Sequence, residues 1–116
     1  MKYALLIYNA PDARDLPEGQ LEALIDEYQE IFQSPGVIDG QQLQLPGSAT
    51  TVRVENGEAL LSDGPFVDAK EYLGGLWLLE ADNLDVATAL AARIPAARMG
   101  GAVEVRPIVE RGALAR

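Results

Sequence analysis

The sequence predicts an α+β fold, a ferredoxin-like sandwich in which two β-α-β units join into one antiparallel sheet with a β-hairpin between them. Three observations lead to this prediction. Short apolar, β-prone runs occur at residues 3–8 and 76–81. Helical apolar periodicity follows each run. An Asn-Gly pair separates two strand-like segments in the middle of the chain. The 116 residues suit one domain, residues 1–116.

The first unit begins with YALLIY at residues 3–8, which we expect to be a buried central strand. A helix starts at Glu18 and ends before Pro35-Gly36. A third segment, residues 37–45, reads as an irregular strand with a bulge at Gly40. The predicted buried stripe of the helix has i, i+3, i+4, i+7 and i+11 spacing and comprises Leu21, Leu24, Ile25, Tyr28 and Phe32.

The hairpin and the second unit follow. Asn56-Gly57 is typical of a two-residue type I′ loop, in which both central residues have positive φ. The strand at 76–81 is followed by a helix over about 83–94, with Asp82 as its expected N-cap. Its expected apolar face comprises Val86, Leu90 and Ile94. The last strand alternates apolar and charged side chains over residues 103–106 and is limited by Pro107.

This order of elements places both helices on one face of the sheet. The other face would then expose a large apolar area, which small domains rarely do. We therefore expect a homodimer in which two copies pack sheet to sheet.

Composition excludes several classes of function. The chain has no cysteine and no histidine, which excludes thiol nucleophiles, zinc hydrolases and Ser-His-Asp hydrolases. We expect no metal, and any metal would need a site of carboxylate or carbonyl oxygens. We also expect no cofactor, since neither glycine pair has phosphate-loop spacing. The net charge of −9 argues against nucleic acid as a partner. No apolar run is long enough to span a membrane, and we expect a cytoplasmic protein.

Acidic residues are concentrated between residues 12 and 30. This segment holds seven acids and one base, Arg14. A solvated helix face is the ordinary interpretation, and an acidic docking surface is the alternative.

The segment DGPFVDAKEYLGG, residues 63–75, is the most distinctive of the chain. Its first four residues combine an Asx-type acceptor, a permissive glycine and a proline, and this combination predicts a turn. At its end, Gly74-Gly75 predicts a bulge or a close backbone approach.

Several polar and aromatic side chains near this turn are candidates for a site. Asp63 and Tyr28 are the catalytic candidates, as groups that transfer protons. Each has a structural alternative, turn capping for Asp63 and core packing for Tyr28. The ligand-binding candidates are Tyr8, Asp63, Phe66, Lys70 and Trp77.

The charged residues near these candidates also have structural interpretations. Lys70 and Glu71 are expected to form an ion pair that holds the loop. Arg98 is expected to cap carbonyls at the end of the second helix. For Arg53 and Arg106, binding of an anionic ligand competes with pairing to nearby acids such as Glu55 and Glu104.

The chain resembles the DGPF branch of the YCII-related proteins. The resemblance covers residues 1–109 and is carried by MKYALLIY, GQQLQLPGSATTVRV, DGPFVDAKEYLGG and IPAARMGGAVEVRPI. It implies a dimeric α+β barrel of two ferredoxin-like subunits with facing sheets and a cleft near the sheet. Family members are associated with alternative sigma factors, and one relative is a dehydrochlorinase of aromatic degradation. The His-Asp pair proposed as the active centre of the wider superfamily has no counterpart here, because the chain lacks histidine.

Three functions fit these observations. The first is a small-molecule-binding or regulatory protein with a ligand cleft near the sheet and the DGPF turn. The second is a cofactor-free lyase or isomerase related to dehydrochlorinases. The third is an interaction protein linked to sigma-factor regulation, which would bind through its acidic first helix.

Overall fold

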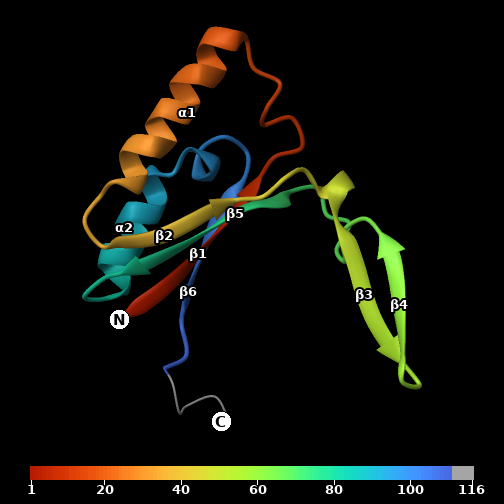
Figure 1. The fold of residues 1–116 in the computed structure, drawn as a ribbon. Coiled ribbons are helices and arrows are strands. Elements are labelled where there is room, and N and C mark those ends of the chain that lie inside the picture. Colours follow the sequence, from red (N-terminus) through yellow and green to blue (C-terminus); the bar gives the residue numbers. More distant parts are fainter. Residues whose placement is uncertain (111–116) are drawn as a thin grey trace.

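The structure is a computed structural model that describes residues 1–110. Four strands form one antiparallel sheet in the order β2-β5-β1-β6 (Figure 1). They are β1 (Lys2–Asn9), β2 (Val37–Gln42), β5 (Tyr72–Glu80) and β6 (Ala102–Pro107). Helix α1 (Glu18–Phe32) connects β1 to β2, and α2 (Leu84–Arg93) connects β5 to β6. These are the two predicted β-α-β units, and the predicted α+β, ferredoxin-like fold is confirmed.

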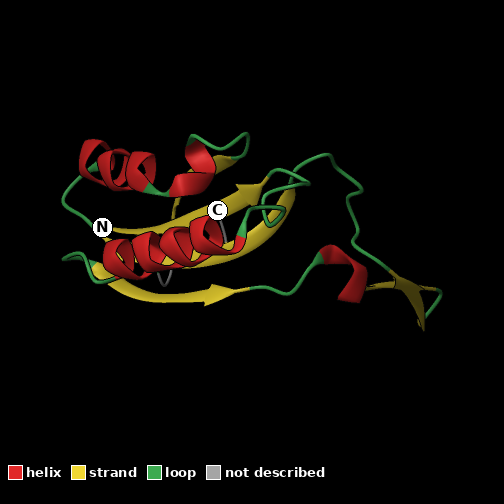
Figure 2. Cartoon of the chain, turned by 90° about the horizontal axis from the view of Figure 1, so that it is seen from above, coloured by secondary structure: helices red, strands yellow, loops and turns green. Residues whose placement is uncertain are grey.

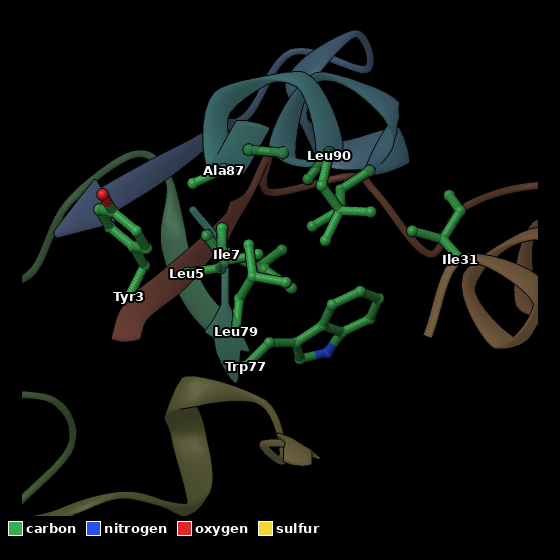
Figure 3. Close-up of a cluster of buried hydrophobic side chains, with 12 residues drawn as sticks. Tyr3, Leu5, Ile7, Ile31, Trp77, Leu79, Ala87 and Leu90 are labelled. Atoms are coloured by element: carbon green, nitrogen blue, oxygen red, sulfur yellow. The ribbon is translucent and has the colours of Figure 1, made fainter. Parts of the chain in front are cut away.

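The hydrophobic core lies on one face of this sheet. Side chains of β1 and β5 alternate between the two faces, and one set of them is buried beneath both helices (Figure 3). Ile31 of α1 and Leu90 of α2 complete the same cluster, so both helices cover the same face. The sheet residues of the core are Tyr3, Leu5, Ile7, Trp77 and Leu79.

The opposite face of the sheet carries no helix. The strand registers pair Leu6 with Leu76 and Ala4 with Leu78, so these side chains point away from the core. We call this surface the open face. Its centre is apolar, with Leu76 45% exposed, and polar residues flank it on the outer strands. Its central residues are Ala4, Leu6, Tyr8, Leu76 and Leu78.

Helix α1 is less buried than its apolar stripe predicts. Its buried residue is Ile31, which lies outside the predicted stripe, whereas Ile25 is 47% exposed and Phe32 37% exposed. The helix approaches the sheet with its C-terminal end, and its N-terminal end rises away from the strands (Figure 1). Only the C-terminal part of the predicted apolar stripe therefore packs against the core.

The start of α2 differs from the prediction by one residue. Asn83 is the N-cap, and its side-chain oxygen accepts a hydrogen bond from the Val86 N–H at 3.0 Å. Because the cap must satisfy an N–H three residues later, Asp82 lies one position too early. Val86, expected in the core, is 49% exposed, and the face toward the sheet is Ala87, Leu90 and Ala91 instead.

Two bulges shape the sheet. The predicted irregularity at Gly74-Gly75 is confirmed, since the β1–β5 register shifts between Ile7 and Tyr8 and passes over Gly74. Strand β5 begins at Tyr72, four residues before the predicted strand. In β2 the register shift lies between Val37 and Asp39, not at Gly40, which is paired with Trp77.

The hairpin stands apart from the sheet as a separate two-stranded element (Figures 1 and 2). It consists of β3 (Thr50–Glu55) and β4 (Glu58–Asp63), and we call it the arm. Its loop residues Asn56 and Gly57 have φ values of 51° and 79°, as the type I′ prediction requires. Within residues 1–110, no helix is both long and apolar enough to cross a membrane.

Candidate functional site

Three aromatic rings meet where the C-terminal half of α1 crosses β5. Tyr28 and Phe32 lie one helical turn apart, and each forms a T-shaped pair with Trp77. The ring centroids are 6.4 Å apart for Tyr28–Trp77 and 5.2 Å for Phe32–Trp77, with interplanar angles of 77° and 73°. We call these three residues the aromatic cluster. Within the cluster, Trp77 is buried and Phe32 is partly exposed. The cluster is therefore accessible from the surface at the Phe32 ring.

A glycine in the neighbouring strand makes room for these rings. Gly40 lies opposite Trp77 in the β2–β5 ladder. A Cβ at this position would lie 2.6 Å from Phe32 Cε1 and 2.6 Å from Trp77 Cδ1, both too close for a real contact. The absence of a side chain at residue 40 therefore allows the two rings to pack edge to face.

The Gly74 bulge brings polar groups to the end of the sheet. A Cβ at Gly74 would collide with the side-chain amide of Asn9. The glycine therefore leaves the space that this amide occupies. Asn9 is paired with Tyr72 in the strand register. The Tyr72 phenol lies near enough to Tyr28 to influence its titration. The Tyr72 phenol therefore lies near the aromatic cluster, and the Asn9 amide lies at the same end of the sheet.

The pKa of Tyr28 is raised above its usual value, mainly because burial disfavours the phenolate. A hydrogen bond with the backbone of Ala96 and the positive charge of Arg98 act in the opposite direction but are weaker. Tyr28 is therefore a neutral phenol near pH 7. It is suited to donating a hydrogen bond and not to acting as a base, and the raised pKa also makes it a weak proton donor.

Arg98 joins α1 to the segment after α2. Its guanidinium donates two hydrogen bonds to the Glu27 carboxylate, at 2.9 and 2.7 Å. The prediction that Arg98 caps the end of α2 is therefore wrong, because the guanidinium reaches a neighbouring helix instead. This hydrogen bonding lowers the pKa of Glu27. A surface depression of about 350 Å³ lies beside the pair, lined by Glu27, Glu30, Ile31, Arg93 and Arg98.

The five predicted ligand-binding residues lie in three separate places. Trp77 belongs to the aromatic cluster, on the core side of the sheet. Tyr8 points to the open face, because it follows the buried Ile7 in β1. Asp63, Phe66 and Lys70 are exposed at and beyond the base of the arm. One chain therefore does not gather these five residues around a single cleft.

The DGPF turn is held by contacts with the arm. The Gly64 N–H donates to the Ala49 carbonyl at 2.7 Å, and the Thr51 hydroxyl donates to the Gly64 carbonyl at 2.8 Å. Gly64 has a φ of 99°, which explains why the turn requires glycine.

Charged residues near the turn and at the sheet edge depart in part from prediction. The ion pairs found in the described part of the chain do not include Arg53, whose guanidinium lies 4.8 Å from the centre of the exposed Phe66 ring. Arg106 forms the predicted ion pair with Glu104. The ion pairs found among residues 1–110 do not include Lys70 with Glu71.

Sequence reasoning placed Trp77 and Tyr28 at a site but missed Phe32, Tyr72 and Asn9. The apolar periodicity of α1 predicts Phe32 as a core residue. The signal for the other two was Gly74, since a strand glycine marks a close approach by another group.

Fold and site together define a small antiparallel α+β domain with an aromatic cluster beneath its first helix and an open sheet face. The chain belongs to the YCII-related family, whose YCII-related domain matches residues 1–111.

One curated protein and one solved structure are similar to this chain. An uncharacterised protein of Rhizobium meliloti (strain 1021) is 39% identical over 62 residues, which is 53% of this chain and half of that protein's length. A solved structure with the same fold is 5-chloro-2-hydroxyhydroquinone dehydrochlorinase from Burkholderia phenoliruptrix AC1100, in complex with 2,5-dihydroxybenzoquinone. The two chains superpose over 95% of each with a TM-score of 0.52 and 14% identity.

Proposed function

We propose that this chain is a small-molecule-binding or regulatory protein of the DGPF branch of its family, and that its ligand binds at the aromatic cluster. One observation carries the proposal: Tyr28 and Phe32 pack edge-on against Trp77, and the Phe32 ring is 37% exposed. Ligand sites combine apolar and aromatic walls with a few polar groups that fix orientation. The neutral Tyr28 phenol supplies such a group.

The chemistry of the cluster favours a planar aromatic ligand with hydroxyl or carbonyl groups. Aromatic rings prefer edge-to-face or offset partners, and a phenol donates a hydrogen bond to a ligand oxygen. The dehydrochlorinase that shares the fold was solved with 2,5-dihydroxybenzoquinone, which makes this compound a reasonable first probe. Asp63, Phe66, Lys70 and Tyr8 lie away from the cluster within one chain. They would join the site only if a second copy brought them there.

A homodimer packed through the open faces is part of the proposal. The centre of this face is apolar, and Leu76 remains 45% exposed in the single chain. Burying such a side chain contributes roughly 1.5–3 kcal/mol. Polar residues of β2 and β6 surround this centre, as in many protein interfaces.

The second candidate is a cofactor-free lyase or isomerase. It is favoured by the shared fold with a dehydrochlorinase and by Tyr28, whose neutral phenol can donate a hydrogen bond to a substrate oxygen, although its raised pKa makes it a weak proton donor. Asp63, the other catalytic candidate, is exposed at the base of the arm and distant in the fold from the aromatic cluster. The binding function is preferred because the Glu27 carboxylate, which lies close enough to raise the pKa of Tyr28, is engaged by two hydrogen bonds from Arg98 and is not free to act as a base.

The test uses Trp77, the single tryptophan of the chain, as a fluorescent reporter. We expect 2,5-dihydroxybenzoquinone or a related hydroxybenzoate to change its emission saturably, after correction for absorbance by the compound. Phe32→Ala should weaken binding about 3- to 10-fold, since an aromatic pair contributes about 0.5–1.5 kcal/mol. Tyr28→Phe should weaken the binding of ligands that accept a hydrogen bond. Recovering the probe unchanged supports binding, whereas a product identified by chromatography supports the lyase.

Phe66→Ala is the matched control, because it removes the other phenylalanine at an exposed position outside the cluster. If Phe66→Ala weakens binding and Phe32→Ala does not, the ligand lies at the DGPF turn and the assignment to the cluster is wrong. A panel of aromatic probes with no saturable response would reject the proposal.

A further inference from the structure

The arm presents an apolar face that its own chain leaves exposed. In the β3–β4 register, Val52 lies opposite Leu61 and Val54 lies opposite Ala59, so these four side chains share one face of the hairpin. We call it the arm's apolar face. Val52, Val54 and Leu61 are 59%, 68% and 69% exposed.

The other face of the arm contacts the DGPF turn of the same chain. Thr51 and Arg53 belong to that face by strand alternation. The Thr51 hydroxyl donates to the Gly64 carbonyl, and the Arg53 guanidinium lies over the Phe66 ring. The chain's own DGPF turn thus contacts one side of the arm and leaves the apolar side to solvent.

An isolated hairpin of this kind is not self-sufficient. A two-stranded hairpin is marginally stable in water unless a further strand, a helix or another surface covers one face. The arm forms its own two-stranded sheet, separate from the four-stranded one (Figure 2). Its type I′ loop specifies the hairpin locally but buries none of its apolar side chains. A surface that covered the arm's apolar face would therefore stabilise the arm.

We infer that the arm docks its apolar face on a second copy of this chain and extends the sheet-to-sheet interface beyond the edge of the sheet. The inference rests on the homodimer of the proposed function. The area of the arm's apolar face indicates which partner covers it. The arm's face is about 20 Å long and 10 Å wide, or about 200 Å². A stable interface needs about 800 Å² per partner, so the arm alone does not hold an independent protein.

A second copy of the chain provides the additional interface area that the arm alone lacks. The open face offers about 450 Å² from four strands at ordinary strand spacing. In a two-fold dimer each copy both gives an arm and receives one. The area buried per copy then reaches about 850 Å², the size of an ordinary stable interface.

Charge is consistent with the same occupant. Each copy carries a net charge of −9, so two copies associate only through surfaces that keep their acids apart. The arm's apolar face has one acid, Asp63, at its base. The open face has Asp39 and Glu104 on its outer strands, and Glu104 is paired with Arg106. The acid-rich segment of residues 12–30 belongs largely to α1, on the core side of the sheet.

The experiment compares two neighbouring positions of β4 that point to opposite faces. Leu61→Asp places a charge on the arm's apolar face, and Ser62→Asp places the same charge on the other face. Dimer dissociation is measured by sedimentation velocity over a dilution series of the full chain. We expect Leu61→Asp to raise the dissociation constant at least about 100-fold, since it removes two buried leucines per dimer. Ser62→Asp should change it less than about 3-fold.

A second measurement does not depend on how well the charged variant folds. A photoreactive amino acid replaces Leu61 in one sample and Ser62 in another. We expect a covalent dimer from position 61 and much less from position 62. No covalent dimer from position 61, equal yields from both positions, or equal weakening by both aspartates would overturn the docking of the arm. If one of these outcomes is found and the wild-type chain still dimerises, the proposed homodimer stands and only the docking of the arm is wrong. A monomeric wild-type chain rejects both.

Discussion

Single residues set the geometry of the aromatic cluster. Gly40 illustrates this most clearly, because the space beside its Cα is already filled by the Phe32 and Trp77 rings. Both rings are rigid, and Trp77 is fixed in a central strand. Neither neighbour yields easily to an added methyl group, in contrast to the flexible Asn9 amide beside Gly74.

We predict that Gly40→Ala destabilises the fold by about 1–3 kcal/mol, the usual effect of overpacking a well-filled site. It should also shift the Trp77 emission, since the indole must move. Urea denaturation followed by circular dichroism measures the first effect. Gly47→Ala is the control, because a Cβ there meets nothing within 4 Å. Equal stabilities of the two variants would show that the rings repack without cost.

Local turn chemistry made some residues predictable. Asn56-Gly57 and the Gly74 bulge were identified correctly, because positive φ and close backbone approach demand particular residue types. The N-cap of α2 was misplaced by one residue, since Asp82 and Asn83 are both suitable caps. Only the structure shows which of the two reaches the Val86 N–H.

At the scale of elements, the order of strands and helices was predictable but the depth of burial was not. Apolar periodicity located α1, yet it did not reveal that Ile31, and not Phe32, is its buried residue. That difference depends on the angle at which the helix meets the sheet. The site shows the same limit: Phe32, Gly40 and Trp77 meet through the β2–β5 register, and no local pattern encodes that register.

The Glu27–Arg98 ion pair ties α1 to the segment that follows α2, and its contribution should depend on pH. The pKa of Glu27 is lowered in the folded state by the hydrogen bonds from Arg98. Its stabilising contribution is therefore fully present above the unfolded pKa of about 4.5 and is lost as the pH falls through the lower folded value.

We predict that Glu27→Gln is slightly less stable than wild type at pH 7 and equally stable once the pH is well below 4.5. The effect should be small, because both side chains are more than a third exposed. Urea denaturation at several pH values and constant ionic strength measures it. Glu30→Gln removes the same charge from the same helix without breaking the pair. A Glu27→Gln difference that grows toward acid pH would contradict the assigned cause.

At the scale of the whole molecule, the single chain is extended and thin. Its radius of gyration is 16.3 Å, against about 13 Å expected for a compact chain of this length. Its extents are 48 × 41 × 19 Å. The excess arises from the projecting arm and from a sheet covered on one side only (Figure 1). Both features leave apolar surface that a dimer would bury, so folding and association should be coupled.

This coupling predicts a melting temperature that rises with protein concentration. For a folded dimer, each tenfold increase in concentration adds about 1.4 kcal/mol, which corresponds to about 3–5 °C for an assembly of this size. Leu76→Arg should abolish this dependence, because it places a charge in the middle of the open face. Leu84→Arg is the matched control, since Leu84 is similarly exposed, 51% against 45%, but lies at the start of α2 on the helix side. Calorimetry at three concentrations measures the slope. A wild-type slope of zero would mean that the open face meets solvent in the native protein, and the coupling of folding to association would be wrong.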